Sequence, residues 1–527
     1  MDKTLITRQI KKTTMKLSSY ITVCMLLATV IVSSCSKDKG PFEGRDNTIA
    51  SFQLKKGDVI LQAAIKQDSI VITAPGSFSL SGVTPAVVLS EHARISPDPA
   101  TITNWEQPLD FVVTSYDGLV KTYKYVLKRN IISKEGDIVL MRQADVDTLA
   151  ALQLSRIKGS LTIGKTEGAD SIYSLDKLST ITGISGGLVI NPTYAGKDLK
   201  GLENLETIGG FKIGEDLNSY TQGPLMNLKT IIFPKLTSIL SSMIVNGPGI
   251  TSLQMPVLTN IDFDLQLIFL DSLKTVELPK LQRVLQSVIF QGTFISNALE
   301  TINFPALETI GGDFFCIQYT NLVSVKLPAL TKLSAINILG DLALTTIEAP
   351  KLTTTVAGAD FSSNPALTTL NLAALTKVGG QFRIESSTAI ENLNGVKSLT
   401  EIGGDLNLTS LPSLKDVSAL KTLKKVGGNF LLQYLDQLTD QNLANFAAVN
   451  TIGGSLSIIS VPNLISVNGL SLVTFISRVF IYDNQNLVDY TGLKNVIPTL
   501  SDANWQVSSN RYNPGYQDMV NGNYVAP

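Results

Sequence analysis

The chain has 527 residues, and its 43 lysines and arginines nearly balance its 44 aspartates and glutamates, so the formal net charge is −1. This balance provides no strongly basic surface for binding nucleic acid. One histidine and three cysteines leave almost nothing from which to build a zinc site or a Ser-His or Cys-His catalytic pair.

The N-terminus has the pattern of an export signal. A basic start at Met15-Lys16 precedes a nearly uncharged run, Leu17 to Val32, which is short for a membrane span and typical of a signal peptide. The next residues, VSSC, end at Cys35 and resemble a bacterial lipobox, whose cysteine is acylated after cleavage. Several acyl chains anchor a protein firmly. The alternative is a buried N-terminal helix that ends in an ordinary cysteine.

We therefore expect residues 1–34 to be a lipoprotein signal peptide, with Met15 as an alternative start, and residues 35–46 to be a lipidated Cys35 and its tether. The lipid would place the protein at the outer membrane, on the cell surface. Without residues 1–34, 38 basic and 43 acidic side chains remain, a net charge of −5. Cys316 is then the one remaining free thiol, so the exported protein has no disulfide framework.

Residues 47–130 contain short runs rich in β-branched and aromatic residues, among them SIVITA, LDFVVTS and TYKYVLK. Asp117-Gly118 joins the last two runs and predicts a hairpin turn, because Asp-Gly readily adopts positive φ. Five or more short strands predict a small β-sandwich. The segment from ISPDPATITNW to YKYVLK also resembles the Ig-like module of Bacteroidota surface lipoproteins. His92 is expected in a loop between two strands.

From Asp137 onward the chain is periodic, with a mean repeat of about 24.5 residues. Each copy has an apolar anchor, and apolar residues recur four and six positions after it. One short alternating strand per copy predicts a β-solenoid of about 14 stacked coils, spaced by about 4.8 Å. The anchors are Ile157, Ile184, Ile208, Ile239, Ile261, Val284, Ile310, Leu333, Val356, Val378, Ile402, Val426, Ile452 and Ile476.

Glycine recurs two residues after nine of the anchors. We expect it to provide a corner before each strand, through positive φ and close stacking of backbones. Four coils that lack this glycine carry proline in the preceding arc, where a fixed φ stiffens the bend. These are the coils of Ile239, Ile261, Val284 and Leu333. The nine glycines are Gly159, Gly186, Gly210, Gly312, Gly358, Gly380, Gly404, Gly428 and Gly454.

The recurring L..IGG.L.I pattern resembles the receptor L domain, a right-handed β-helix similar to leucine-rich repeats. The resemblance implies an all-β chain in which a right-handed parallel β-solenoid, residues 137–527, follows the Ig-like β-sandwich. It does not imply receptor signalling, because the cysteines of receptor ectodomains are absent. We expect an N-terminal cap at residues 137–152 and a C-terminal cap at about residues 500–527, since uncapped coils would expose sheet edges.

The glycine pairs recur without the Lys-Ser/Thr of a phosphate loop, so they do not predict nucleotide binding. A carboxylate glycosidase or a β-helix lyase remains conceivable, but no acidic cluster recurs at one strand position of adjacent coils. We therefore expect a non-enzymatic protein without cofactor or metal. Cys316 lies at an inward position and is expected to be a core residue.

The outward residue of each strand is where binding specificity is expected. One row of these residues is Ile244, Gln266, Ile289 and Phe315, and an apolar row on an open sheet face marks a contact site. The alternative is that the row reflects β-propensity or is covered by a loop. If the row is a contact site, changing its three apolar residues together to Asp should abolish binding and leave the melting transition intact. A separate aromatic group, Trp505, Tyr512, Tyr516 and Tyr524, could stack on sugars but is better explained as the terminal cap.

These patterns predict a lipid-anchored adhesin whose solenoid face binds a protein on a host or neighbouring cell. The alternative is a glycan-binding surface lipoprotein of a polysaccharide-uptake system, which the Ig-like module suits equally. Fold alone does not choose between them. The row at Ile244 favours a protein ligand because it is more aliphatic than aromatic.

Overall fold

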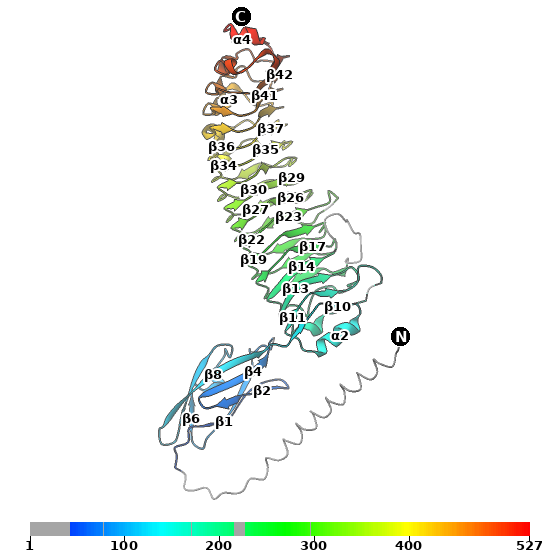
Figure 1. The fold of residues 1–527 in the computed structure, drawn as a ribbon, viewed down its shortest axis with the longest axis vertical. Helices are drawn as coiled ribbons and strands as arrows, with labels where there is room; N and C mark the ends of the chain where they lie inside the picture. The colour runs from blue at the N-terminus through cyan, green and yellow to red at the C-terminus, as the bar shows by residue number, and fades with distance from the viewer. Residues whose placement is uncertain (1–42, 77, 170, 215–226, 296) are drawn as a thin grey trace. The chain divides into compact units, whose positions relative to one another are not determined.

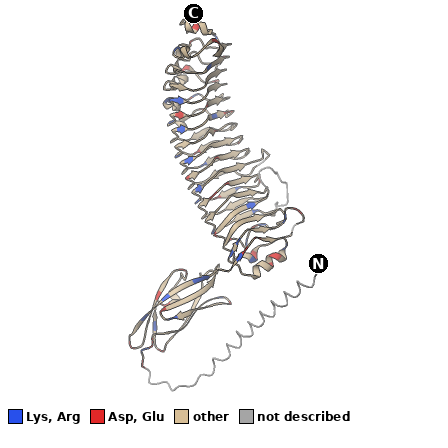
Figure 2. Ribbon diagram, viewed as in Figure 1, with Lys and Arg blue, Asp and Glu red and all other residues tan. Residues whose placement is uncertain are grey.

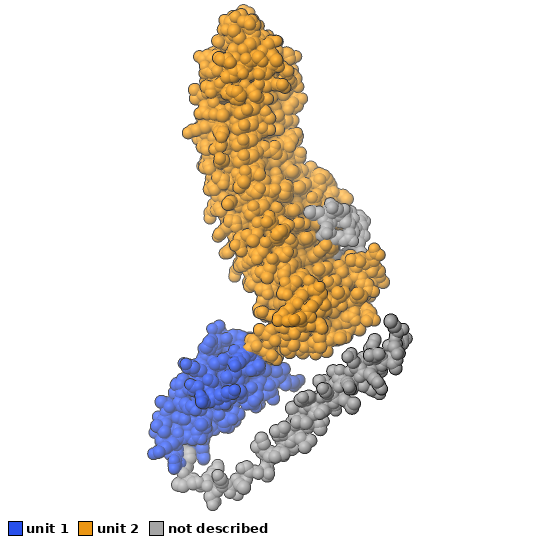
Figure 3. All heavy atoms as spheres, in the orientation of Figure 1, with its two compact units in different colours: residues 1–74, 79–128 blue, residues 75–78, 129–527 orange. Residues whose placement is uncertain are grey.

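The structure is a computed structural model that describes residues 43–76, 78–169, 171–214, 227–295 and 297–527. The predicted signal peptide and Cys35 lie outside these residues. The chain forms two compact units, one from residues up to 74 and 79–128 and one from residues 75–78 and 129–527 (Figure 3). No helix among the described residues is long and apolar enough to cross a membrane.

The first unit consists of two small antiparallel sheets, as expected for the predicted β-sandwich. Phe52 and Trp105 pack edge to face in its core, with ring centroids 5.8 Å apart. Gly118 has φ +93° in the predicted hairpin turn, and His92 lies in an exposed turn. One sheet contains β2 (Val59–Gln62), β1 (Ile49–Lys56) and β5 (Thr84–Leu89). The other contains β3 (Ala64–Lys66), β4 (Ser69–Pro75), β8 (Val120–Asn130), β7 (Leu109–Thr114) and β6 (Arg94–Ser96), and η1 (Pro99–Thr101) precedes β7.

The second unit is a parallel β-solenoid, which confirms the predicted fold class. Figure 1 shows its coils stacked from β10 (Ile138–Leu140) towards β42 (Arg478–Tyr482). Each coil has three sides. The corner ladder contains the anchor residue, the face ladder contains the strand that follows the anchor, and the back is the remaining side of the coil. β13 (Gly183–Ile190) and β14 (Thr207–Ile213) belong to both the corner and the face ladders. The other corner strands are β9 (Ser133–Glu135), β11 (Arg156–Lys158), β16 (Ser238–Ile239), β19 (Asn260–Ile261), β22 (Arg283–Val284), β25 (Thr309–Ile310), β28 (Lys332–Leu333), β31 (Thr354–Thr355), β34 (Lys377–Val378), β36 (Glu401–Ile402), β38 (Lys425–Val426) and β40 (Thr451–Ile452).

The face ladder pairs each coil with the next in a constant register. The strands β10 and β43 (Trp505–Ser508) extend it at the two ends, beyond the predicted coils. Its other separate strands are β12 (Leu161–Ile163), β17 (Met243–Asn246), β20 (Leu265–Ile268), β23 (Val288–Gln291), β26 (Phe314–Ile317), β29 (Ile336–Leu339), β32 (Ala359–Asp360), β35 (Phe382–Glu385), β37 (Leu406–Thr409), β39 (Phe430–Gln433), β41 (Ser455–Ile459) and β42 (Arg478–Tyr482).

The back of the solenoid changes character along the chain. Middle coils have short parallel strands, and prolines such as Pro234 and Pro279 lie in the turns after them, outside the ladders as expected. The strands are β15 (Thr230–Ile232), β18 (Ser252–Gln254), β21 (Thr275–Glu277), β24 (Thr301–Asn303), β27 (Ser324–Lys326), β30 (Thr346–Glu348) and β33 (Thr369–Asn371). Outer coils have helical turns instead: η2 (Asp176–Leu178), η4 (Asn394–Val396), η5 (Ser418–Thr422), α3 (Asp440–Leu443), η6 (Ala444–Phe446), η7 (Asn468–Leu470) and η8 (Thr491–Leu493).

Both ends of the solenoid are covered. At the first coil, β10 (Ile138–Leu140) leads into α2 (Gln143–Ala151), which buries Val146 and Leu149. At the other end, η9 (Ile497–Thr499) and η10 (Asp502–Asn504) precede β43 (Trp505–Ser508), and α4 (Tyr516–Val520) buries Met519. Trp505 is buried and its indole donates a hydrogen bond to the Pro514 carbonyl at 2.8 Å, so this tryptophan is part of the cap.

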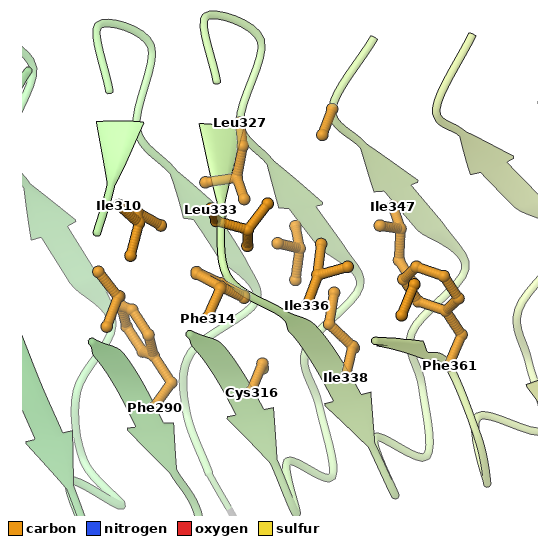
Figure 4. Packing of buried hydrophobic residues seen from close by; sticks show 14 of the residues in the cluster. Phe290, Ile310, Phe314, Cys316, Leu327, Leu333, Ile336, Ile338, Ile347 and Phe361 are labelled. Atoms are coloured by element: carbon orange, nitrogen blue, oxygen red, sulfur yellow. The ribbon is translucent and has the colours of Figure 1, made fainter. Parts of the chain in front are cut away.

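The core runs along the solenoid axis, because alternate residues of each face strand point inward. Figure 4 shows Phe290, Phe314 and Cys316 directed into this interior from adjacent coils. All three are fully buried, so Cys316 is a core residue as predicted. One predicted anchor is wrong by one residue. Thr355, and not Val356, pairs with Val378 and is buried, while Val356 is exposed.

The glycine pairs serve close packing and not positive φ, which corrects half of the prediction. None of the nine glycines has positive φ. Instead, the glycines allow a close approach of backbones. Gly428 is the second glycine of its pair, and a Cβ on it would lie 2.9 Å from the carbonyl carbon of Gly404 in the preceding coil. Positive φ occurs after the face strands, at residues such as Ser386 and Ser410. The glycines are therefore required because the backbones of adjacent coils nearly touch at this corner.

Candidate functional site

The predicted row on the face ladder has the register that the sequence indicated. Ile244 pairs with Gln266, Gln266 with Ile289, and Ile289 with Phe315. All four residues are only partly exposed. Asp at the three apolar positions would therefore disturb packing as well as any contact surface.

A second outward row lies two residues further along the same strands. It includes Ile268, which is fully buried, and Gln291, whose amide donates a hydrogen bond to Gln318 at 3.0 Å. Because each of its residues is only partly exposed, the apolar row does not form a freely exposed patch. This arrangement favours the alternative that β-propensity and local cover explain the row.

Further along the face ladder, charged and polar side chains replace the apolar ones. Arg383 lies between Asp360, at 3.6 Å, and Glu385, with which it forms a close ion pair. Asp360 also accepts a hydrogen bond from the Ser362 backbone at 3.1 Å. These groups mainly satisfy one another, so they stabilise the face and leave few free groups for a ligand.

A shallow groove of about 340 Å³ runs across the corner ladder of three successive coils. Two residues from each coil line it: Thr259, Asn260, Gln282, Arg283, Glu308 and Thr309. Corner strands β19, β22 and β25 position these side chains, because register pairing places Asn260, Arg283 and Thr309 side by side. The groove therefore presents amide, guanidinium, carboxylate and hydroxyl groups together.

Asp262 organises one side of this groove. Its Oδ1 accepts a hydrogen bond from the Asn260 amide at 2.9 Å and lies 3.6 Å from the Arg283 guanidinium. Two of the groove's polar side chains are thus held in place by one carboxylate. By contrast, the side chains of Gln282, Glu308 and Thr309 have no hydrogen bond or ion pair with any described residue.

Exposed apolar side chains lie at the corner of three coils, those of Ile239, Ile261 and Val284. Leu240, Phe263 and Leu285 are exposed by 55%, 50% and 42%. They occupy positions one or two residues after the anchor, where other coils carry the glycine pair. They were not among the predicted site residues, although the missing glycines in these three coils were a signal that side chains protrude there.

A closed polar group lies inside the core near Cys316. Burial raises the pKa of the Asp341 carboxyl to about 7, although its Oδ1 accepts a hydrogen bond from the Tyr319 backbone at 2.8 Å. Burial also raises the pKa of the Cys316 thiol, and the nearby Asp341 adds to this effect. These groups are inaccessible to solvent, so they form no ligand site.

Charged residues of both signs are scattered along the ribbon in Figure 2. In the described part of the chain, no three histidine, cysteine, aspartate or glutamate residues are arranged to hold a metal ion. The aromatic residues near the C-terminus are held by the cap. The Tyr516 hydroxyl donates a hydrogen bond to the Leu500 carbonyl at 2.9 Å, and the Tyr512 hydroxyl donates one to Asn523 at 2.9 Å.

Two family models match parts of the chain. Residues 155–247 are similar to the receptor L domain. Residues 49–127 are similar to the N-terminal domain of SGBP, the surface glycan-binding protein. Together the matches cover about a third of the chain, and they support the two resemblances noted in the sequence. A comparison with curated proteins finds no match.

Proposed function

We propose that the protein is a non-enzymatic, glycan-binding protein of the bacterial cell surface, anchored by lipid on Cys35. The observation that carries this proposal is the similarity of residues 49–127 to the N-terminal domain of SGBP. A fold by itself does not define a ligand, so this similarity weighs more than the architecture of the solenoid. The alternative reading of the sequence thus becomes the preferred one.

The solenoid is the part of the chain suited to bind an extended ligand. Stacked coils create long continuous surfaces, which solenoid proteins commonly use for recognition. Its corner groove offers hydrogen-bonding side chains from three adjacent coils. Such convergent polar groups suit the many hydroxyls of a sugar chain.

A second candidate function is adhesion to a protein, which the similarity of residues 155–247 to the receptor L domain favours. The row Ile244, Gln266, Ile289 and Phe315 would then contact the partner. The partial burial of this row argues against it, because strong protein contacts usually centre on accessible apolar or aromatic anchors.

The two candidates can be separated with one preparation. The chain from residue 36, which lacks the predicted signal peptide and Cys35, is applied to a glycan array and to a panel of extracellular-matrix proteins. We expect binding to one or a few related glycans. Binding to proteins alone would overturn the proposal and restore adhesion.

The lipid anchor is tested by replacing the acylated residue. In cells fed an alkyne-labelled fatty acid, we expect the unchanged chain to incorporate label and to sediment with membranes. The variant Cys35→Ala should lose both properties, and Cys316→Ala serves as the matched control. Equal labelling of the Cys35→Ala variant would contradict lipidation at Cys35.

A further inference from the structure

The corner groove offers polar side chains that can hold the hydroxyls of a sugar ring. Its amide, carboxylate and guanidinium side chains are planar and can bind neighbouring hydroxyls in pairs. The side chains of Gln282, Glu308 and Thr309 have no hydrogen bond or ion pair with any described residue, so they can bind a ligand without breaking existing contacts. Asn260 and Arg283 are already oriented by Asp262, which lowers the entropy cost of binding.

Phe263 provides an exposed apolar surface on the coil that contributes Asn260 to the groove. It follows Asp262 in the chain, and half of its surface is exposed. The negative face of an aromatic ring attracts the weakly positive C–H groups of a pyranose. Leu240 and Leu285, on the coils before and after, are also exposed and occupy the register position of Asp262.

The charge of the groove selects among sugars. Arg283 and Glu308 are the charged residues of its lining, and Asp262 pairs with Arg283, so the three together carry one net negative charge. Within the lining, a uronic or sialic acid would meet the Glu308 carboxylate, while Arg283 is already paired with Asp262, which disfavours an acidic sugar there. Lys332, which pairs in register with Thr309 on the next coil, lies outside this lining. A neutral pyranose carries no such penalty.

We propose that the corner groove and Phe263 form a binding site for a neutral pyranose chain. The site spans the coils of Ile261, Val284 and Ile310. The sugar hydroxyls bind Gln282, Glu308 and Thr309, and a ring packs on Phe263. Successive coils are about 4.8 Å apart, so a glycan that follows the solenoid axis meets a new set of side chains at each coil. This proposal rests on the proposed glycan-binding function.

The test compares variants of the full chain, purified in a detergent without a sugar headgroup. The probes are three neutral polysaccharides, mixed-linkage β-glucan, xylan and α-mannan, and the acidic polygalacturonate. Affinity gel electrophoresis and calorimetry measure binding. We expect binding to at least one neutral polymer, and we expect Phe263→Ala and the double variant Gln282→Ala/Glu308→Ala each to weaken it at least tenfold.

Phe475→Ala is the matched control. Phe475 is 48% exposed, close to the value for Phe263, and lies near the C-terminal end of the solenoid. We expect this control to bind like the unchanged chain. All substituted side chains are exposed, so circular dichroism melting curves should coincide for the variants and the unchanged chain.

The outcomes distinguish the site from the function. If the unchanged chain binds a neutral glycan and the groove variants bind equally well, the site is wrong and glycan binding stands. Binding to polygalacturonate alone would overturn the neutral ligand class. If the unchanged chain binds none of these probes and no sugar on the glycan array, both the site and the proposed function are overturned.

Discussion

The close contact between glycine corners gives the sharpest prediction for stability. Gly427 is the first residue of a glycine pair, and a Cβ on it would lie 2.1 Å from the carbonyl oxygen of Gly403 in the preceding coil. The same 2.1 Å approach recurs for Gly403 on Gly379 and for Gly453 on Gly427. The obstacle is backbone held by ladder hydrogen bonds, so it cannot rotate away as a side chain would. The variant Gly427→Ala must therefore push two coils apart.

The expected cost follows from the size of the overlap. Real Cβ atoms essentially never come closer than 3.0 Å to another heavy atom, so the coils must separate locally by nearly an ångström. Overpacking a core typically costs about 1–3 kcal/mol, and backbone obstruction places this site at the upper end, at about 3 kcal/mol. Alanine gives the unfolded chain a lower conformational entropy than glycine does, and this offsets less than about 1 kcal/mol of the cost.

Urea unfolding of both chains, followed by far-ultraviolet circular dichroism, measures the difference. The matched control is Gly187→Ala, since a Cβ there would have its nearest neighbour at 3.8 Å. We expect the control to be as stable as the unchanged chain or slightly more stable. Equal stability of the Gly427→Ala and Gly187→Ala variants would refute the argument that backbone contact selects glycine at this corner.

Three further predictions concern the core and the cap. Asp341 has a folded-state pKa of about 7, above its ordinary value, so the free energy of unfolding should fall by up to about 4 kcal/mol as pH rises from about 4 to 7. The variant Asp341→Asn should remove this dependence. Parallel pH profiles of the variant and the unchanged chain in urea unfolding would contradict this prediction. The variant Met519→Ala should lower the free energy of unfolding by about 2–4 kcal/mol, because Met519 is fully buried, and the Trp505 fluorescence should change at a lower urea concentration. The variant Met141→Ala, at an exposed position, should change the stability little. An equal loss of stability in both variants would argue against the cap. The Cys316 thiol should react with a thiol reagent only as fast as the chain unfolds, and rapid reaction of the folded protein would disprove its burial.

Much of the fold was predictable from sequence, because the two periods involved are simple. The repeat of about 24.5 residues indicated coils, and alternation within each copy indicated which residues point inward. The pairing of Ile289 with Phe315 follows directly from aligning the copies. The exception at Thr355 has a clear cause, because a buried threonine replaces the expected aliphatic anchor and the neighbouring Val356 resembles one.

The candidate site was far less predictable. Its lining residues come from three coils and, apart from two threonines, differ in type, so no repeat pattern connects Asn260, Gln282 and Glu308. Their neighbourhood depends on the stacking of coils about 23 to 26 residues apart in the chain, as the pairings of Asn260 with Arg283 and of Arg283 with Thr309 show. Phe263 was visible only as a departure from the glycine pattern.

By itself, the sequence determined the class of the fold, the register of the face ladder and the inward position of Cys316. These depend on periodicity, which a linear chain displays directly. The tertiary structure decided how the glycines act, which apolar residues remain exposed and where polar side chains converge. Those properties depend on distances between coils, and the chain expresses such distances only after it has folded.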